Sequence, residues 1–495
     1  MTAGANRQLE LNVAGGARIC VPFSLDQITP YVLLEQEDWF EDEIRFVRRW
    51  LRRGMQAVDI GANIGVYTVA MAQAVGSSGR VWAFEPTPAA ADSLQRSLSL
   101  NGFENVIVFR AAVSDCEGTV AFSVGNQSEL NAVAKPGSAG RDIAQVRAVT
   151  LDRMAAEHGW TDMDLVKLDV EGHEFEAIRG GAGFLGESSP LIMFEIKADE
   201  TFDLRILGPL ADLGYEFYRL LPGPLWLVPF DPHQPVDIYQ LNLFACKPDR
   251  AESVAALGML VRADAADTGT PSAEAWKSYL RRMPYARGLA ARWPSKAGFF
   301  SGGGLATYLE GLAAYAHSRE ENRNASERHG WLTRSFYCVV EALDVAPTLA
   351  RRISYARLAR DLGMRYEAIG AFAEAADRLS AESQAALAEP FLAPSERYEF
   401  LHPERDGREW LKCGVVEQFE KLRLYSSAFA GATSLEVLAP IRGLPQCSAE
   451  MERRWQLARM RNGMQAGPEP AAVLRERSDE NLNPQFWSGA GLSRQ

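Results

Sequence analysis

The chain has 495 residues, of which 47% are hydrophobic and 23% are charged, and its formal net charge is −12. This length is too great for one ordinary hydrophobic core, so we expect at least two domains, and this composition excludes a largely disordered chain. The excess of acidic residues lies in the first half, which argues against a nucleic-acid partner.

Cysteine spacing and the absence of long apolar segments indicate the cellular compartment that we expect for the protein. The six cysteines lie far apart and none forms a C-x-x-C pair, which indicates a reducing compartment and argues against a structural zinc site. The first residues hold no apolar run typical of a signal peptide, and no window of about 18 apolar residues predicts a membrane span. We therefore expect a cytoplasmic protein without a membrane span.

The first half, taken as a domain over residues 1–250, alternates apolar runs with helical patterns. The runs predict strands at residues 56–60, 80–85, 105–110, 164–169 and 191–196. Helical patterns over 66–74 and 89–100 separate the early strands, and Pro88 and Gly102 mark the start and the end of the second helix. Such alternation predicts a mostly parallel sheet with helices on both faces.

Two departures from this alternation are expected. Residues 117–147 contain short alternating pieces and several glycines, which predict an inserted β-structure before Thr150. Residues 215–221 and 239–246 flank a Pro-Gly-Pro turn region and predict an antiparallel hairpin, a common arrangement at the edge of a parallel sheet.

The second half has a different composition. Residues 251–272 are small and polar and predict a linker. Within a domain expected at 273–462, apolar residues at helical spacing predict helices over 305–316, 332–343, 349–362 and 366–379. Residues 463–495 are rich in Pro, Asn and Ser and predict a loose tail.

One helix pair resembles a tetratricopeptide-type repeat. Residues 354–375 place small residues where two helices would meet, with Gly363 at the turn and Phe372 between the helices. Three good copies are not found, and a single repeat cannot bury its own face. An irregular helical bundle is therefore an equal alternative.

The most informative segment is D-I-G-A-N-I-G, which begins at Asp59 and joins a strand to a helix. A dinucleotide fingerprint needs glycine at its first, third and sixth positions. These positions hold Gly61, Asn63 and Val66, so two of the three fail. The spacing from Gly61 to Gly65, with an acid two residues before, suits S-adenosylmethionine instead, and a nicotinamide oxidoreductase on a similar fold is the alternative.

Acidic residues follow several of the predicted strands. Ligands of open α/β sheets bind beyond the carboxyl ends of the strands, and Asp59, Glu85, Asp169 and Glu195 all lie at that edge. Glu85 is predicted to accept two hydrogen bonds from ribose hydroxyls, and its alternative role is that of a turn residue before a proline.

The remaining cofactor candidates each have a structural alternative. Asp59 would hold the turn or meet a cationic amine, and its structural alternative is to cap the next helix. Asn63 would offer its amide to the ligand or adopt a left-handed turn, which asparagine tolerates. Ala112 would line the adenine or belong to the ordinary core. Asp169 completes the predicted cofactor set.

The second informative block is K-L-D-V-E-G-H-E at residues 167–174. Crowded carboxylates raise one another's pKa, which suits base chemistry or a cation. We predict His173 as the first candidate for a catalytic base, Glu171 as the second and Glu195 as the third, and a residue at the start of a helix is an equal alternative role for His173. Asp169 and Glu171 could bind a cation, but oxygen ligands have no diagnostic spacing, so no metal is predicted.

Five ordered motifs resemble the FkbM family of methyltransferases. They are V-D-I-G-A-N-I-G, F-E-P, T-L-D at 150–152, K-L-D-V-E-G-H-E and F-E-I near 195. The resemblance covers about residues 40–250. Five motifs in the same order are much more specific than one glycine turn.

The resemblance implies an α/β fold of the class I methyltransferase type: a doubly wound, mostly parallel sheet with an antiparallel edge hairpin. It implies nothing about residues 273–495, where the helical patterns predict an all-α domain. It implies S-adenosylmethionine as cofactor and a hydroxyl acceptor on a sugar, glycan or other small metabolite. The helical domain would bind the acceptor or a protein partner. The non-enzymatic alternative is a helical partner-binding protein with an inactive methyltransferase fold.

Overall fold

The computed structural model describes residues 8–124, 132–133, 142–198, 201–262, 269–290, 293, 303–381, 389–403 and 407–464. The chain divides into two compact units. The first unit comprises Met1–Leu220, Leu227–Val236 and Gln240–Leu260, and the second comprises Leu221–Trp226, Asp237–Tyr239 and Val261–Gln495.

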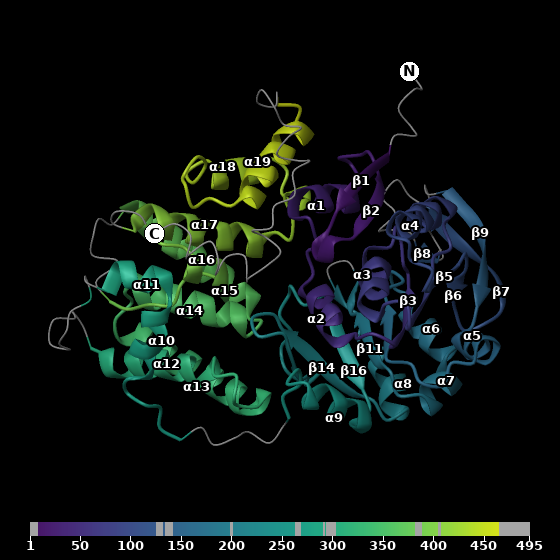
Figure 1. Ribbon diagram of the computed structural model, residues 1–495, viewed down its shortest axis with the longest axis horizontal. Coiled ribbons are helices and arrows are strands. Elements are labelled where there is room, and N and C mark those ends of the chain that lie inside the picture. Colours follow the sequence, from purple (N-terminus) through teal and green to yellow (C-terminus); the bar gives the residue numbers. More distant parts are fainter. Residues whose placement is uncertain are drawn as a thin grey trace. The chain divides into compact units, whose positions relative to one another are not determined.

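The first unit is built on an eight-stranded sheet with the order β15-β14-β16-β11-β10-β3-β4-β5 (Figure 1). The strands are β3 Gln56–Ile60, β4 Arg80–Phe84, β5 Val106–Phe109, β10 Leu165–Leu168, β11 Leu191–Glu195, β14 Glu216–Leu221, β15 Trp226–Pro229 and β16 Asn242–Cys246. The run from β11 to β5 is parallel, and β16 is antiparallel to β11 and to β14. The expected class I fold, with its antiparallel edge, is confirmed.

Helices cover both faces of this sheet. On one face, α5 Leu151–His158, α6 Glu174–Arg179, α7 Ala182–Glu187 and α8 Leu207–Asp212 pack on Val58, Ile60 and their neighbours. On the other face, α1 Ile28–Gln36, α3 Val66–Val75 and α4 Pro88–Asn101 enclose a second core around Ala83, together with the hairpin of β1 Gln8–Asn12 and β2 Arg18–Pro22. The face of Ala83 is also the face of Asp59, because the two residues are register partners.

The β-insertion before Thr150 is confirmed. Strands β6 Ala112–Val113, β7 Gly118–Val124, β8 Ala132–Val133 and β9 Asp142–Val149 form a second sheet with the order β6-β9-β7-β8. The strands β7 and β9 are antiparallel over seven register pairs.

Three details differ from the expectations. The Pro-Gly-Pro region joins β14 to β15 rather than to β16, and β15 lies at the outer edge of the sheet. The expected linker 251–272 begins inside helix α9 Pro248–Ala256, and its residues 263–268 lie outside the described residues. The N-terminal hairpin, α1 and α2 Asp42–Trp50 were not expected.

The described part of the second unit is helical, as expected. Its helices are α10 Ala275–Arg282, α11 Pro284–Leu289, α12 Leu305–Ser318, α13 Ala325–Val345, α14 Leu349–Asp361, α15 Arg365–Ala381, α16 Glu396–Phe400, α17 Arg408–Arg423, α18 Thr433–Leu438 and α19 Ala449–Arg461. Ala356, Ala359, Ala368, Ala375 and Phe372 of the α14–α15 pair are fully buried. This burial fits close helix packing, and the tetratricopeptide resemblance stays a prediction.

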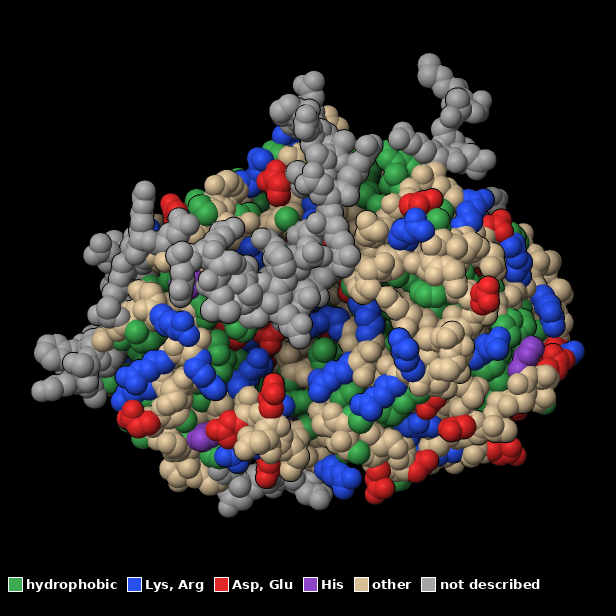
Figure 2. Space-filling view, viewed as in Figure 1, with side chains coloured by type: hydrophobic (Ala, Val, Ile, Leu, Met, Phe, Trp, Pro, Cys, Tyr) green, Lys and Arg blue, Asp and Glu red, His purple; other side chains and the backbone are tan. Residues whose placement is uncertain are grey.

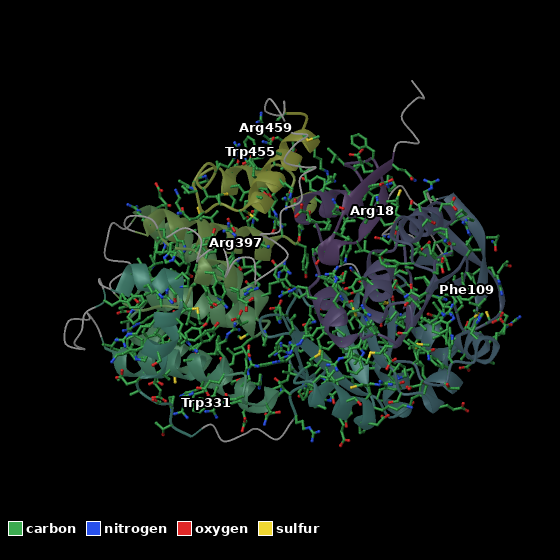
Figure 3. All side chains as sticks on the ribbon, in the orientation of Figure 1. Arg18, Phe109, Trp331, Arg397, Trp455 and Arg459 are labelled. Atoms are coloured by element: carbon green, nitrogen blue, oxygen red, sulfur yellow. The ribbon has the colours of Figure 1, made fainter. Side chains whose placement is uncertain are left out.

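Aromatic and arginine side chains pair repeatedly in the second unit. Trp455 and Arg459 lie on α19 (Figure 3), and the guanidinium carbon of Arg459 is 4.5 Å from the ring centroid of Trp455. The guanidinium carbon of Arg442, from the segment between α18 and α19, lies 3.4 Å from the same centroid. Basic and acidic side chains are interspersed over the visible face of the molecule (Figure 2).

No helix within the described residues has the length and hydropathy to cross a membrane. Residues 465–495, most of the expected loose tail, lie outside the described residues.

Candidate active site

The glycine turn after β3 is fixed by backbone geometry. Gly61 has a φ of +78°, and a Cβ at this position would overlap the main-chain carbonyl oxygen of Asp169. Gly65 has a φ of +95° and caps α3, and Asn63 has a φ of +48°. Left-handed backbone is costly for most residues and tolerated by asparagine. The sequence D-I-G-A-N-I-G therefore has the residue types that this turn requires.

Glu85, directly after β4, links the turn to the neighbouring strand. Its Oε2 accepts a hydrogen bond from the Asn63 N–H at 2.9 Å, and its Oε1 accepts bonds from the Thr87 N–H and Oγ1 at 2.8 and 2.5 Å. A carboxylate has about four acceptor sites, and bonds from Asn63 and Thr87 use three of them, so about one site stays open and the ribose contact stays a prediction. Burial raises the pKa of Glu85, and the bonds from Thr87 and Asn63 oppose that rise.

Asp59 is fully buried beneath the turn. Its Oδ2 accepts a hydrogen bond from the Thr68 hydroxyl at 2.5 Å, and its Oδ1 lies 3.7 Å from the Lys167 Nζ without a hydrogen-bond partner. Burial raises the pKa of Asp59, and Lys167 opposes that rise. Asp59 thus ties the start of α3 to β10, so its contact with the chain is structural.

Lys167 forms ion pairs with two carboxylates, those of Asp59 and Asp169. Its Nζ donates to the Asp169 Oδ2 at 2.9 Å and lies 5.0 Å from the ring centroid of Tyr67. Burial lowers the pKa of Lys167, but Asp169 and Asp59 outweigh this effect and raise it. Lys167 is therefore a buried cation, ionised at neutral pH.

Glu41 is a site residue that the sequence interpretation missed. The Tyr67 hydroxyl donates to the Glu41 Oε2 at 2.6 Å, and burial and the charge of Asp169 both raise the pKa of Glu41. The segment before α2 is held by the ion pair of Asp38 with Arg48, at 2.7 and 2.8 Å. The only signal in the sequence is the acidic stretch E-D-W-F-E-D-E, which resembles an ordinary solvated run.

Three of the predicted carboxylates come together at the ends of β10 and β11. One oxygen each of Asp169, Glu171 and Glu195 lies within 4.8 Å of the others. Burial raises the pKa of Glu195 well above its usual range, and the charges of Asp169 and Glu171 add to this rise. We refer to these three residues as the carboxylate cluster.

Asn242 is a second residue that sequence interpretation missed. It is the register partner of Glu195 across the β11–β16 pair, and directly opposed residues in antiparallel strands project from the same face. Only 4% of Asn242 is exposed, and its side-chain nitrogen has no hydrogen-bond partner. A lone asparagine in the apolar strand N-L-F-A-C was the available signal.

His173 is held by neighbours of its own. Its Nε2 lies 3.0 Å from the Ser114 Oγ, and its Nδ1 lies 3.4 Å from the Glu176 carboxylate. The carboxylate cluster, as the described residues define it, does not include His173. Proton abstraction by Nε2 would first require the separation of His173 from Ser114.

Other acids of the family motifs hold loops in place. Glu174 Oε1 accepts hydrogen bonds from the N–H groups of Val170 and Gly172, both at 3.1 Å. Asp152 of T-L-D accepts from the N–H groups of Gly183 and Phe184 at 3.2 and 2.7 Å and so caps α7. These two carboxylates stabilise the loop and the helix next to the carboxylate cluster and are not members of it.

Ala112 lies on β6, in the second sheet. Its side chain packs in a small cluster with Phe122 and Val146. The described contacts of this side chain therefore belong to the packing of the second sheet, and a role beside adenine stays a prediction.

Comparison with protein families gives one matching model. Residues 59–217 match the methyltransferase FkbM domain. This range contains the glycine turn, Glu85, the T-L-D motif and the carboxylate cluster, and it excludes Glu41, Asn242 and the helical unit.

Two curated relatives are similar to the first unit. A methyltransferase named sdnD from Sordaria araneosa is 31% identical over 192 residues, covering 33% of this chain and 74% of the relative. The hexuronic acid methyltransferase AglP from Haloferax volcanii is 29% identical over 163 residues, covering 33% of this chain and 64% of that protein.

Solved structures are similar at a lower level. The methyltransferase FkbM structure from Methylobacillus flagellatus has 18% identity and a TM-score of 0.26, covering 39% of this chain and 43% of that one. An S-adenosylmethionine-dependent O-methyltransferase from Thermotoga maritima has 17% identity and a TM-score of 0.25, covering 49% and 78%.

Proposed function

The chain belongs to the FkbM methyltransferase family, and on this premise we propose that it transfers a methyl group from S-adenosylmethionine to a hydroxyl oxygen of a sugar, glycan or other small metabolite. The observation that supports this proposal most strongly is the carboxylate cluster beside the glycine turn, at the carboxyl ends of adjacent parallel strands.

The donor site is proposed at the glycine turn. The residues present fit the cofactor in three respects. The left-handed turn brings backbone N–H groups to the start of α3, Glu85 keeps one acceptor site for a ribose hydroxyl, and the side-chain oxygen of Asn63 is buried without a partner. When bound, S-adenosylmethionine supplies an electrophilic methyl group on a sulfonium sulfur.

The acceptor hydroxyl is proposed to meet the carboxylate cluster. An alcohol is a poor nucleophile until its proton is removed. A carboxylate whose pKa is raised, as burial and neighbouring charges raise that of Glu195, is a better base near neutral pH. The acceptor oxygen then bonds to the methyl carbon as the carbon–sulfur bond breaks, and the hydroxyl proton passes to the cluster.

The roles of the predicted bases are ordered by their surroundings. Glu195 and Glu171 lie in the cluster, whereas His173 faces Ser114 and Glu176. We therefore propose Glu195 as the first candidate, with Glu171 next, and His173 as a positioning residue for the loop before α6.

The acceptor class is inferred from a relative and from chemistry. The hexuronic acid methyltransferase AglP acts, by its name, on a sugar acid, which supports a carbohydrate acceptor.

The six cysteines are free in the structure, which supports the cytoplasmic location expected from their spacing.

The proposal is tested by calorimetry with S-adenosylmethionine, followed by transfer of labelled methyl to sugar and metabolite extracts. We expect saturable donor binding and a labelled product whose methyl group resists mild base, as an ether does and an ester does not. Glu195→Gln is expected to lower kcat by at least tenfold without weakening donor binding. An absence of donor binding by the wild type would reject the donor site, and an ester product would reject hydroxyl transfer.

Two alternatives have clear outcomes in the same assays. Binding of a nicotinamide nucleotide in place of S-adenosylmethionine would favour an oxidoreductase. Donor binding without transfer to any acceptor would favour the partner-binding alternative, in which the helical unit binds a protein and the methyltransferase fold is inactive.

A further inference from the structure

The carboxylate cluster contains one carboxylate, that of Glu195, whose charge no described side chain neutralises. The charge of Lys167 is paired with Asp169 and Asp59, and its Nζ also lies over the ring of Tyr67. Lys167 therefore does not neutralise Glu195. Within the described residues, no side chain donates a hydrogen bond to the Glu195 carboxylate or forms an ion pair with it. Like charges a few ångströms apart in a partly buried site repel strongly unless a proton or a cation lies between them.

A second, independent observation indicates an oxygen-binding ligand at the same place. Asn242 lies directly opposite Glu195 on the neighbouring strand and projects from the same face. Its amide is buried, and its nitrogen bonds to no described group, although a buried amide without a partner costs about 1–3 kcal/mol. An amide can also turn its oxygen toward a ligand, because its two orientations have the same shape.

We propose that Asp169, Glu171, Glu195 and Asn242 form a site for a divalent cation with oxygen ligands, such as Mg²⁺ or Mn²⁺. Carboxylate and amide oxygens are the ligands that these hard cations prefer. The donor set contains no sulfur or imidazole, which argues against zinc or copper. Mg²⁺ usually keeps several of its waters, so a site with few protein ligands leaves positions for an acceptor oxygen.

The position of the site suggests its role. Glu195 ends β11, Asp169 follows the adjacent parallel strand β10, and the glycine turn follows the next strand, β3. A cation here would polarise the acceptor hydroxyl and lower its pKa, with the released proton passing to an unbound carboxylate oxygen or to water. This role rests on the proposed hydroxyl methylation, whereas the binding of the cation does not.

Cation binding is tested on the full chain after treatment with EDTA. Mn²⁺ is added, and free Mn²⁺ is measured by electron paramagnetic resonance. We expect one Mn²⁺ to bind per chain and to be displaced by Mg²⁺. Glu195→Gln and Glu171→Gln are each expected to weaken Mn²⁺ binding by at least tenfold, while Glu252→Gln, on the exposed surface of α9, leaves it unchanged.

Folding of the variants is checked by urea unfolding without metal. Glu195→Gln removes a buried charge, so in EDTA this variant should unfold at the same or a higher urea concentration than the wild type. Added Mg²⁺ should stabilise the wild type and leave the stability of Glu195→Gln unchanged. The site is rejected if the wild type binds no Mn²⁺ saturably, or if both cluster variants bind it as tightly as Glu252→Gln does.

The same preparation separates this inference from the proposed function. Calorimetry with S-adenosylmethionine is run in EDTA and again with Mn²⁺. Donor binding in both cases without Mn²⁺ binding would remove the cation site and keep the methyltransferase proposal. Mn²⁺ binding without donor binding would support the cation site and reject the donor site.

Discussion

At the scale of residues, the site depends on positions where a side chain has no space. We expect Gly61→Ala to destabilise the chain more than Gly102→Ala. Both glycines have positive φ, which costs an alanine about 1–2 kcal/mol, but a Cβ at 61 also meets the Asp169 carbonyl, whereas nothing lies within 4 Å of one at 102. Urea unfolding of the two variants measures the difference, and an equal loss of stability would show that the turn can move away from β10.

Glu85 gives a prediction about donor affinity. A hydrogen bond between a hydroxyl and a charged group contributes about 1.5–3 kcal/mol, so we expect Glu85→Gln to weaken S-adenosylmethionine binding by roughly 10- to 100-fold. Glu104→Gln, at an exposed position, is the matched control. Unchanged affinity in Glu85→Gln would mean that the bonds from Thr87 and Asn63 are the whole role of Glu85.

The pH dependence of this contact has a defined sign. Burial raises the pKa of Glu85, and only the ionised carboxylate has the full set of acceptor sites. Donor affinity should therefore be highest above this raised pKa and fall as the pH drops through it. Calorimetry across the acid range should show this fall in the wild type and a flatter profile in Glu85→Gln, and parallel profiles would assign the fall to another group.

At the scale of elements, the T-L-D motif holds a helix rather than a ligand. Because Asp152 caps α7 through two N–H groups, Asp152→Ala should cost about 0.5–2 kcal/mol of stability and leave the affinity for S-adenosylmethionine unchanged. Asp212→Ala, at an exposed position of α8, is the control for stability. A loss of donor affinity in a folded Asp152→Ala chain would contradict a purely structural role.

The elements that sequence predicted well have strong local patterns. The buried strands of the parallel sheet are apolar runs, and α4 lies between Pro88 and Gly102. The start of α13 was missed by several residues, although Asn324 and Glu327 form a capping box there. The edge strand β15 is only four residues long and follows a Pro-Gly-Pro turn, so periodicity had little to detect.

The site was only partly predictable for a related reason. Asp59, Glu85, Asp169 and Glu195 lie in or directly after the last residues of parallel strands of one sheet, and strand order brings such ends together. The contact of His173 with Ser114 depends on the placement of Ser114, which directly follows β6 of the second sheet. The position of Asn242 depends on an antiparallel register that no local pattern defines.

At the scale of the whole molecule, the two units have separate cores, and the proposed donor site belongs to the first unit alone. A ligand stabilises only the cooperative unit that binds it, by about 2.7 kcal/mol at a concentration of 100 times Kd. We therefore expect calorimetric unfolding to show two transitions, of which S-adenosylmethionine raises only one.

A variant in the second unit identifies the other transition. Arg365 lies between the rings of Tyr239 and Tyr425, at 5.0 and 3.7 Å from their centroids, and its Nε donates to the Leu422 carbonyl at 2.7 Å. All four residues belong to the second unit. Because a cation–π contact contributes about 0.5–2 kcal/mol, Arg365→Ala should lower the transition that S-adenosylmethionine does not raise. A single transition that both the donor and Arg365→Ala shift would instead mean that the units unfold together, and the helical unit would then contribute directly to the stability of the donor site.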